Sequence, residues 1–529
     1  MYKKKGNELS IREVVERNTK MKSEEFLNPA GVPYIYGIKE AVQCLLEHKD
    51  EPIHIVGDYD ADGITATTIM VVGLKRYGLN PSYRLPRRFS EGYGLSEKII
   101  DEIEEGVIIT VDNGIAALPA VKKAKEKGLT VIVTDHHLAV TDEKTKTYLL
   151  PEADVIVDPH IEDKSGFKDY CGAAIAYQFV SELLPERKLP DLKVLASIAT
   201  VTDVMPLIGA NRMLVQEGLA LLNKKRCLPG LLALCEKAIQ TDVITESDYG
   251  FKLGPIINAS GRLYDNGAEK PLELFLSDYK NPRLPWKVDN LLKTNNERKK
   301  LVDDAIQKLL PTIDPLERPM VVYDEEWSEG IIGLIAGWLC ERFQCPVIAF
   351  TNTEKPGILK ASGRSIDSVH LKNTLDQIKP LLLGYGGHSG AAGLAIKAEN
   401  LDKFKKAFKD TCGPIPELTT DAYYDLDAEL DQLDGLISQI NRYAPYGNGN
   451  PEIKFRIETE LDYGKYSVKE ENNTFFYRDE NYTLLGYDLA NVIKALQYPK
   501  KVQFICTISE HWYKGEKSYT LMIQNIERV

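Results

Sequence analysis

The sequence lacks the features that mark several classes of protein. No stretch approaches the roughly 18 uninterrupted apolar residues of a membrane span, and the N-terminus MYKKKGNELS has no apolar secretory core. The eight cysteines are dispersed without a C-x-x-C spacing, so we expect reduced, mostly buried thiols. No Walker sequence G-x-x-x-x-G-K-[ST] occurs, which disfavours a P-loop nucleotide hydrolase. These absences predict a cytoplasmic protein with no membrane partner.

The sequence also lacks a surplus of basic residues. It has 66 Lys and Arg against 78 Asp and Glu, a net charge of −12. Taken alone, this charge argues mildly against a nucleic-acid partner, because such proteins usually carry a net basic surface. The length of 529 residues predicts about three or four domains at roughly 100–200 residues each.

Residues from about 51 to 160 alternate between short apolar runs and helical patterns. The runs Ile53 to Val56, Val107 to Val111, Leu129 to Val133 and Val155 to Val157 each lead into a turn that contains aspartate. Helical patterns such as Ile64 to Tyr77 lie between several of them. Buried strands alternating with helices predict a parallel sheet, whose ligands lie beyond the carboxyl ends of the strands.

The rest of the chain changes character twice. From about residue 172 to 235 the pattern is mostly helical, and an apolar stripe over residues 284–309 predicts a long helix. A second α/β block follows. Short alternating runs over residues 454–529 then predict a small antiparallel barrel or sandwich.

The most informative motif is a run of three aspartates directly after the first strand. Asp58, Asp60 and Asp62 occupy alternate positions of G-D-Y-D-A-D-G. Such close carboxylates repel one another unless a hard divalent cation accepts them as ligands. A calcium loop of the EF-hand type is disfavoured, because its twelfth position needs glutamate and here holds Ile69. A solvated turn with coincidental acids is the other interpretation.

Two further strands end in candidate ligands at the same edge of the predicted sheet. Asp112 follows one strand, and Asp135, His136 and His137 follow the next. Mixed carboxylates and imidazoles suit Mn²⁺, Mg²⁺ or Fe²⁺ better than a structural zinc ion. Several shared carboxylates also suggest two ions, the arrangement that activates water for displacement at phosphorus. Asp203, from the residues alone, is equally well explained as a helix-terminus cap.

Two features elsewhere fit a polyanion. The glycine-rich segment 384–393 offers successive backbone N–H groups to a phosphate, and Arg364 adds a guanidinium group, although a tight strand-to-helix turn explains the glycines equally well. Residues 454–529 contain 13 Phe, Trp and Tyr, about 17% against 9% for the whole chain. Such rings stack on bases in an oligonucleotide-binding (OB) fold, or they fill the core of a barrel.

Together these motifs resemble the DHH phosphoesterase superfamily and, within it, the RecJ single-strand-specific exonucleases. The resemblance spans about residues 51 to 455. Its motifs are G-D-Y-D-A-D-G (57–63), R-x-x-E-G-Y-G (88–94), V-D-N-G (111–114), T-D-H-H (134–137), T-D-V-M-P-L (202–207), N-A-S-G-R (258–262), N-N-E-R-K-K, W-S-E-G-I-I-G (327–333), S-G-R (362–364), G-Y-G-G-H-S-G-A-A-G-L (384–394) and P-Y-G-N-G-N-P (445–451).

The resemblance implies a role for individual residues. It implies that two Mn²⁺ or Mg²⁺ ions are bound by Asp58, Asp60, Asp62, Asp112, His136 and Asp203, with Asp58 either a ligand or a group just behind the ligands. It implies catalytic roles for His137, Asp135, Arg262 and His388. The residues that it implies for gripping the substrate's phosphates or its end are Arg88, Asn258, Arg262, Ser362, Arg364, Gly386, Gly387 and His388.

The resemblance also implies an α/β multidomain architecture. It predicts a parallel-sheet DHH domain, a long connecting helix, a second, smaller α/β DHH-associated domain and a C-terminal OB-like β-barrel. The boundaries that we expect are 1–50 for an N-terminal extension, 51–280 for the DHH catalytic domain with its helical part, 281–311 for the connecting helix, 312–412 for the DHH-associated substrate-binding domain and 413–529 for the OB-like nucleic-acid-binding domain.

The activity implied is a metal-dependent 5′-to-3′ exonuclease that releases 5′-mononucleotides from single-stranded DNA in DNA repair and recombination. A monomer is expected, with a helicase and a single-strand-binding protein as partners. The alternatives are a DHH phosphodiesterase of short RNA or cyclic dinucleotides, and a non-catalytic replication scaffold. The chain departs from the family pattern at Ser260, where alanine is frequent, and at Ser328 and Glu329, where W-H-x-G is common.

The net charge of −12 changes meaning in this interpretation. Six of the acids gather at one metal site, where two divalent ions would offset up to four charges. Residues 283–311 carry seven basic against four acidic side chains. We therefore expect DNA to follow a narrow basic and aromatic track, with binding that weakens as salt is added.

Overall fold

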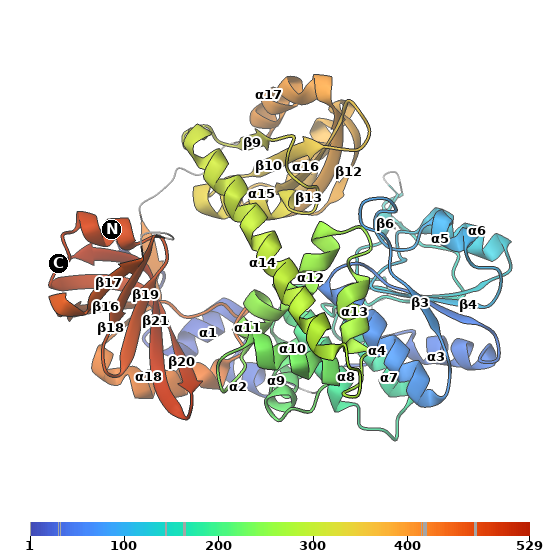
Figure 1. Cartoon of the computed structure of the whole chain (residues 1–529), viewed down its shortest axis with the longest axis horizontal. Helices are drawn as coiled ribbons and strands as arrows, with labels where there is room; N and C mark the ends of the chain where they lie inside the picture. Colours follow the sequence, from blue (N-terminus) through green and yellow to red (C-terminus); the bar gives the residue numbers. More distant parts are fainter. Residues whose placement is uncertain are drawn as a thin grey trace.

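The computed structural model describes residues 2–29, 31, 33–142, 145–161, 165–413, 415, 421–469 and 473–529. Figure 1 shows a parallel-sheet domain on the right, a smaller α/β domain at the top and a β-rich domain on the left, with one long helix running diagonally between them. Among the described helices, none has an apolar stretch that would cross a bilayer.

The first domain is built on a five-stranded parallel sheet. Its strands are paired in the order β3 (Ser82–Arg84), β2 (Ile53–Val56), β4 (Val107–Val111), β5 (Thr130–Thr134) and β8 (Val155–Val157). All five residues of β4 are buried, because helices cover both faces of the sheet. Helices α3 (Ile38–Glu47), α4 (Ala61–Tyr77) and α7 (Gly172–Leu183) share one core, and α5 (Glu97–Asp101) and α6 (Leu118–Glu126) form another. The predicted parallel sheet is confirmed.

A layer of helices extends this core. It comprises α8 (Pro190–Thr202), α9 (Gly209–Asn223), α10 (Pro229–Ala238), α11 (Glu246–Asp248), a π-helical turn (Tyr249–Leu253), α12 (Gly254–Leu263) and α13 (Glu269–Phe275). The long helix α14 (Leu284–Leu309) packs against α10, α12 and α13 at its start and against α15 (Ile332–Phe343) near its end. Its bounds are those that the apolar stripe predicts, and at 1.5 Å per residue it is about 39 Å long.

The second domain has a mixed five-stranded sheet. The order is β12 (Leu382–Gly387), β13 (Ala391–Lys397), β11 (Ile358–Arg364), β10 (Val347–Asn352) and β9 (Met320–Tyr323), with only β9 and β10 parallel. Helices α15, α16 (Leu371–Gln377) and α17 (Leu401–Thr411) pack on it. The glycine-rich segment forms the β12–β13 hairpin, so the strand-to-helix turn that we considered for it is wrong.

The third domain has a seven-stranded sheet, ordered β15 (Leu426–Ala428), β16 (Phe455–Glu460), β20 (Lys501–Tyr513), β21 (Glu516–Arg528), β19 (Tyr482–Gly486), β18 (Thr474–Arg478) and β17 (Tyr466–Lys469). Most pairs are antiparallel, as predicted, but β15 with β16 and β19 with β21 are parallel. The first of these pairs is reached through helix α18 (Leu433–Tyr443), since a parallel pair needs a crossover. A shorter helix, α19 (Ala490–Ala495), packs on the same sheet.

The first 50 residues are shared between two domains. Strand β1 (Tyr2–Lys4) pairs in parallel with β14 (Ala422–Tyr424), and helices α1 (Ile11–Thr19) and α2 (Ser23–Leu27) contribute to the core of the third domain. Helix α3 belongs instead to the first domain. The expected N-terminal extension 1–50 is thus divided, because its partners lie about four hundred residues away and leave no local pattern. A small hairpin, β6 (Val140–Thr141) with β7 (Tyr148–Leu149), lies outside these sheets.

Candidate functional site

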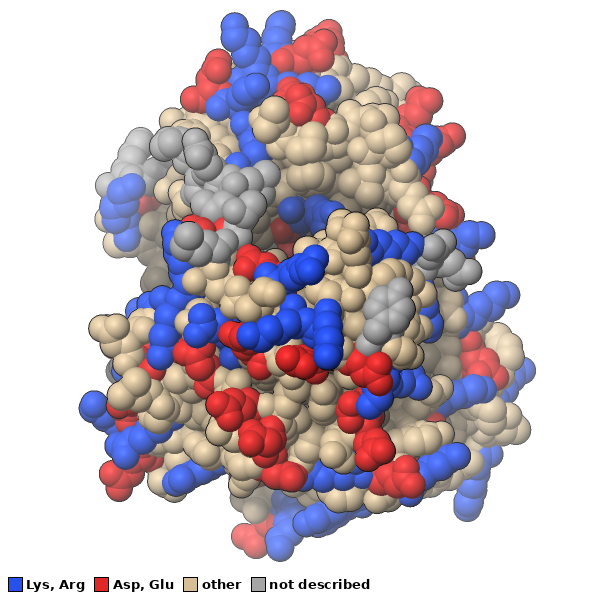
Figure 2. All heavy atoms as spheres, turned by 90° about the vertical axis from the view of Figure 1, so that its left-hand side faces the viewer, with Lys and Arg blue, Asp and Glu red and all other residues tan. Residues whose placement is uncertain are grey.

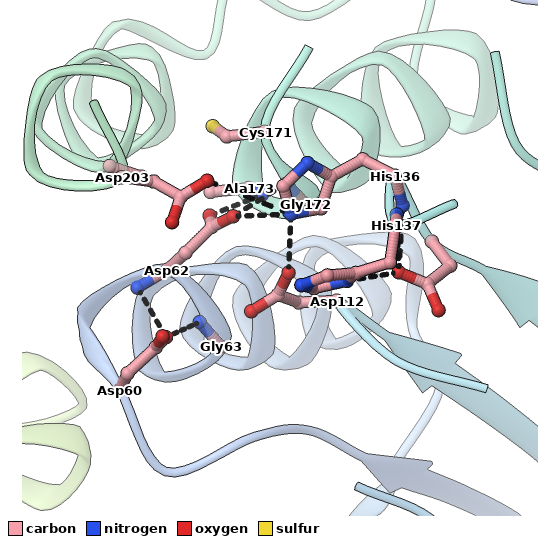
Figure 3. Close-up of polar contacts among 12 residues, drawn as sticks. Asp60, Asp62, Gly63, Asp112, His136, His137, Cys171, Gly172, Ala173 and Asp203 are labelled. Atoms are coloured by element: carbon pink, nitrogen blue, oxygen red, sulfur yellow. Dashed lines mark hydrogen bonds and ion pairs between the residues drawn. The ribbon is translucent and has the colours of Figure 1, made fainter. Parts of the chain in front are cut away.

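Aspartate-bearing turns meet at one edge of the parallel sheet. They follow β2, β4 and β5. Strand β2 has β3 on one side and β4 on the other, so the crevice at the carboxyl ends of β2 and β4 is the switch point where open α/β sheets bind ligands. Figure 3 shows Asp62, Asp112, His136 and Asp203 pointing toward one another there.

The starts of two helices hold the triple-aspartate turn. Asp60 is the N-cap of α4, and its Oδ1 accepts hydrogen bonds from the N–H groups of Asp62 (3.0 Å) and Gly63 (3.1 Å). The carboxylate of Asp62 accepts hydrogen bonds from Gly172 N (2.7 Å) and Ala173 N (2.8 Å) at the start of α7. The helix dipole there favours the ionised carboxylate.

His136 lies among three carboxylates. Its Nε2 is 3.1 Å from Asp112 Oδ1, 3.6 Å from Asp62 Oδ2 and 3.7 Å from Asp203 Oδ2. Asp203 is the C-cap of α8, so a helix of the added layer carries it to the sheet edge. Asp112 has a φ of 63°, a left-handed conformation that few residues other than glycine, asparagine and aspartate adopt readily, and its buried carboxylate is presented to the cluster from this backbone.

The possible ligand atoms form overlapping groups. Three sets each lie within 4.8 Å: Asp58, Asp60 and Asp112; Asp62, His136 and Asp203; and Asp112, His136 and His137. Both carboxylate oxygens of Asp58 and Oδ1 of Asp112 are buried and have no hydrogen-bond partner among the described residues. Asp58 and Asp112 are therefore brought to the cluster without hydrogen-bond donors for these oxygens, whereas Asp60 and Asp62 accept backbone N–H groups.

This donor set fits divalent cations. Burial raises the pKa of Asp58, Asp112 and Asp203 well above the usual range, and neighbouring carboxylates add to the effect. Buried, unpartnered carboxylates that face one another are costly unless a cation binds them. Oxygen ligands with one imidazole suit Mn²⁺ or Mg²⁺. Because Asp112 and His136 each belong to two sets, the donors can hold two neighbouring ions.

His137 is held by Asp135 at the rim of this cluster. Oδ1 of Asp135 lies 2.8 Å from Nδ1 of His137 and also accepts the N–H groups of His136 and His137. Burial by itself would lower the pKa of His137, but the hydrogen bond and charge of Asp135 raise it to about 9. Burial likewise opposes ionisation of Asp135, yet the contact with His137 keeps the pKa of Asp135 below its usual value. The metal-free site thus carries a cationic imidazole at neutral pH.

Four guanidinium groups gather at Arg262, which itself lies near Asp60 of the acidic cluster. Arg88 follows β3, Arg262 is in α12, Arg298 is in α14 and Arg364 is in β11. Burial lowers the pKa of Arg262, and the charges of Arg88, Arg364 and Arg298 lower it further. Arg88 lies 4.5 Å over the ring of Tyr59, within the triple-aspartate turn. Guanidinium groups that gather in this way favour a bound anion such as phosphate.

Three family models match the chain in succession. They are the DHH family N-terminal domain over residues 52–202, the DHHA1 domain over 317–413 and the RecJ OB domain over 424–525. A single-stranded-DNA-specific exonuclease RecJ of Haemophilus influenzae is 30% identical over 99% of this chain and 98% of its own length. This chain belongs to the RecJ family. RecJ of Thermus thermophilus is also 30% identical, over 96% of this chain and 73% of its own length.

Solved RecJ structures share the fold and contain the expected ions. The crystal structure of Thermus thermophilus RecJ in complex with Mn²⁺ has a TM-score of 0.81 and 28% identity, covering 98% of this chain and 75% of that one. An exonuclease RecJ bound to manganese has a TM-score of 0.61 and 32% identity, covering 72% and 96%. The second and third domains described above are accordingly the DHHA1 and OB domains, and the first is the DHH domain.

The DHHA1 domain presents most of its expected substrate residues beside the DHH site. Ser362 Oγ accepts a hydrogen bond from Arg364 Nη1 (3.1 Å). Burial lowers the pKa of His388, and the nearby charges of Arg364 and His137 lower it further, so His388 lies close to both. Gly386 and Gly387 are exposed at the end of β12, directly before His388.

Glu329, one of the departures from the RecJ pattern, is neutralised locally. Its Oε2 lies 2.6 Å from Lys360 Nζ on the neighbouring strand β11. The next residue, Gly330, packs directly on the backbone of Arg262, where an added Cβ would lie 1.7 Å from the carbonyl oxygen. The turn that carries Glu329 therefore forms one of the contacts between the two α/β domains.

The structure adds contacts that the sequence does not assign. Asn258 Oδ1 accepts a hydrogen bond from Ala61 N (2.8 Å), so this side chain fixes the start of α4. The hydroxyl of Tyr93 donates to the carbonyl oxygen of Asp112 (2.8 Å) and lies 3.2 Å from Nδ1 of His137. Tyr93 and Arg298 both lie within quoted family motifs, and that position was the only signal in the sequence for them.

Proposed function

We propose that this chain is a metal-dependent 5′-to-3′ exonuclease that hydrolyses phosphodiester bonds of single-stranded DNA and releases 5′-mononucleotides. The observation that carries the proposal is the buried, unpartnered carboxylate cluster with four guanidinium groups beside it. A phosphodiester hydrolase of this kind needs both features. The carboxylates bind the cations that act on the reacting oxygens, and the guanidinium groups supply fixed positive charge for the phosphate. The printed names of the RecJ relatives support the single-stranded DNA substrate.

We assign the metal ligands as Asp58, Asp60, Asp62, Asp112, His136 and Asp203, holding two Mn²⁺ or Mg²⁺ ions. When bound, such ions lower the pKa of water and neutralise charge on phosphate oxygens. The protein contributes the fixed geometry. Asp60 and Asp62 are held by helix N-termini, so their carboxylates do not reorient during the reaction.

The remaining catalytic roles fall to His137, Asp135, Arg262 and His388. His137, held by Asp135, lies at the rim of the cluster, where its ring would donate a hydrogen bond to a phosphate oxygen. Arg262 lies where the two α/β domains meet, and its guanidinium group would bind a phosphate between them; burial and the neighbouring guanidinium groups lower its pKa to about 9, and a bound phosphate would offset this effect. Arg88, Ser362, Arg364 and the Gly386–His388 turn would grip the end of the strand, while Asn258 keeps the aspartate turn in place.

The DNA strand is expected to run from the metal site toward the OB domain. Figure 2, which faces that side of the molecule, shows Lys and Arg side chains gathered across the middle of the face, with acidic side chains mainly below them. In this division of labour, residues 51–280 carry the chemistry, 281–311 connect, 312–412 hold the substrate end, and 413–529, with the N-terminal strand and helices, bind the strand farther along. We further propose a cytoplasmic monomer that acts in DNA repair and recombination with a helicase and a single-strand-binding protein.

End-labelled digestion tests the activity. Long 5′-labelled and 3′-labelled strands of DNA and RNA, single and double, are incubated with Mn²⁺ and sampled over time. We expect labelled mononucleotide at once from 5′-labelled single-stranded DNA and a descending ladder from the 3′-labelled strand. Activity confined to short oligomers would instead indicate a phosphodiesterase of short RNA or cyclic dinucleotides. Complete absence of activity would indicate a non-catalytic scaffold.

A further inference from the structure

The turn that carries Asp203 is held by backbone hydrogen bonds to the end of α8, from Asp203 N to Ala199 O (2.8 Å) and from Met205 N to Thr200 O (3.0 Å), and also from outside the DHH domain. Helix α8 ends at Asp203, and the next residue, Val204, has a φ of 57°. A β-branched residue in this left-handed region is strained, and it persists only where the surrounding structure holds it. The side chain of Val204 is 64% exposed, so its own packing does not supply the restraint.

A second restraint, beyond the hydrogen bonds to α8, comes from the loop of residues 445–450, which leads into the OB sheet. Asn448 Nδ2 donates to the carbonyl oxygen of Val204 (2.8 Å), and the carbonyl oxygen of Asn448 accepts a hydrogen bond from Leu207 N (2.7 Å). The two contacts bracket the turn on both sides. Gly449 makes the close approach possible, since it has a φ of 74° and an added Cβ would lie 3.2 Å from Cβ of Pro206.

The loop itself is anchored on the far side of the turn. Arg212 Nη2 and Gln216 Nε2, both from α9, each donate to the carbonyl oxygen of Ala444 at 3.0 Å. Tyr446 N donates to Glu246 Oε1 (2.8 Å). The guanidinium group of Arg212 is buried and lies 4.6 Å over the ring of Phe26, from the N-terminal helices. The loop is therefore a fixed strut between the OB and DHH domains.

We propose that Asn448 is a positioning residue for the metal site, which places one ligand, Asp203, under the control of the OB domain. This inference rests on the proposed role of Asp203 as a ligand. Oδ2 of Asp203 lies 3.7 Å from His136 Nε2, so a shift of the turn would move this carboxylate out of the ligand set. The loop motif P-Y-G-N-G-N-P, to which no role was assigned above, thereby gains one: it positions a metal ligand of another domain.

The test measures Mn²⁺ binding directly, by electron paramagnetic resonance of free Mn²⁺ titrated with metal-free protein. Loss of one hydrogen bond predicts a roughly threefold to tenfold weaker affinity for the weaker ion in Asn448→Ala. Asn448→Asp should be worse than Asn448→Ala, because a carboxylate cannot donate to the Val204 carbonyl and repels it. Asn441→Ala, at an exposed position of the preceding helix α18, is the matched control and should bind Mn²⁺ normally.

Further variants distinguish a failure of the proposed role of Asn448 from a failure of the assignment of Asp203 as a metal ligand. Gly449→Ala should weaken Mn²⁺ binding, whereas Gly357→Ala pays the same backbone penalty at a φ of 79° with no neighbour within 4 Å and should not. If Asp203→Ala weakens Mn²⁺ binding while the Asn448 and Gly449 variants bind normally, the strut is overturned and the metal site stands. If Asp203→Ala binds Mn²⁺ normally, the ligand assignment itself is wrong.

Discussion

Nε2 of His136 lies 3.1 Å from Oδ1 of Asp112, yet that oxygen has no hydrogen-bond partner among the described residues. The two atoms are close without being aligned for a hydrogen bond, as ligands that face a shared cation would be. Asp112 also adopts a left-handed backbone conformation to present its carboxylate. The two side chains are thus arranged to bind a shared metal ion rather than to form a hydrogen bond with each other.

Removal of either partner should abolish hydrolysis. In Asp112→Ala or His136→Ala, we expect Mn²⁺ binding to weaken by at least tenfold and nuclease activity to fall below detection, because both residues belong to two ligand sets. Single-stranded DNA binding, measured by fluorescence anisotropy, should survive, since the guanidinium groups and OB domain are intact. Normal Mn²⁺-dependent activity in both variants would disprove the metal assignment.

The stability of the metal-free protein should fall as the pH rises. Burial and neighbouring carboxylates raise the pKa of Asp58, so the folded protein holds a proton there that the unfolded chain has released. The free energy of unfolding then decreases from about pH 4, the pKa of an unfolded aspartate, up to the raised folded pKa, at about 1.4 kcal/mol per pKa unit.

The Asp58→Asn variant isolates this effect. Asparagine carries no charge at any pH, so in EDTA the variant should be more stable than the parent by a margin that grows as the pH rises above about 4, the pKa of an unfolded aspartate, in denaturant titrations. Saturating Mn²⁺ should reverse the order, because the ion stabilises the parent through a ligand that the variant lacks. A margin in EDTA that stays constant or shrinks with pH would contradict the raised pKa.

The Asp135–His137 pair should matter for turnover more than for binding. Asp135→Asn removes the charge that raises the pKa of His137, so the imidazole loses its positive charge near neutral pH. We expect kcat to fall by about 10²-fold with little change in Mn²⁺ affinity, the size seen for one preorganised electrostatic contact. Asp154→Asn, an acid at the domain surface paired with Lys125, is the control. An equal loss in Mn²⁺ affinity would show that the pair holds the metal site instead.

The contact between the two α/β domains should be sensitive to one methyl group. In Gly330→Ala the new Cβ would meet the carbonyl carbon and oxygen of Arg262, both backbone atoms that cannot move aside. We expect weaker binding of a 5′-phosphorylated oligonucleotide and lower activity, with Mn²⁺ affinity retained. Gly384→Ala, in the same domain with no atom within 4 Å of the added Cβ, should behave as the parent. Parent-like binding by Gly330→Ala would mean that the domains meet differently in solution.

Much of the DHH domain was predictable because its signals are local. The strands Ile53–Val56 and Val107–Val111 are continuous apolar runs that end in polar turns, and the stripe over Leu284–Leu309 has helical period throughout. The parallel order of the strands then brings Asp58, Asp60, Asp62 and Asp112 to one edge. The sequence was sufficient here because each step depends on neighbouring residues.

The remainder depends on contacts between distant residues. Asp203 is an ambiguous helix cap until α8 is packed against the sheet edge, and only the resemblance suggested its role. The pairing of Tyr2 with Ala422, and the convergence of Arg88, Arg262, Arg298 and Arg364, have no periodic pattern in the chain. The antiparallel prediction for the C-terminal sheet missed two parallel pairs, because a crossover helix does not alter the alternation of its strands.

The pairing of β1 with β14 sets an order of events during synthesis. Tyr2 leaves the ribosome first, but its partner Ala422 follows only after roughly 20–80 s at about 5–20 residues per second. The parallel sheet, complete by Val157, can form while most of the chain is still being made. If Asn448 positions Asp203, the turn that carries this ligand gains its contact with Asn448 only after the 244 residues that separate Asn448 from Val204 have been made. A chain that stops before this loop would then keep the parallel sheet and its aspartates but bind its weaker metal ion less tightly than the longer chain does.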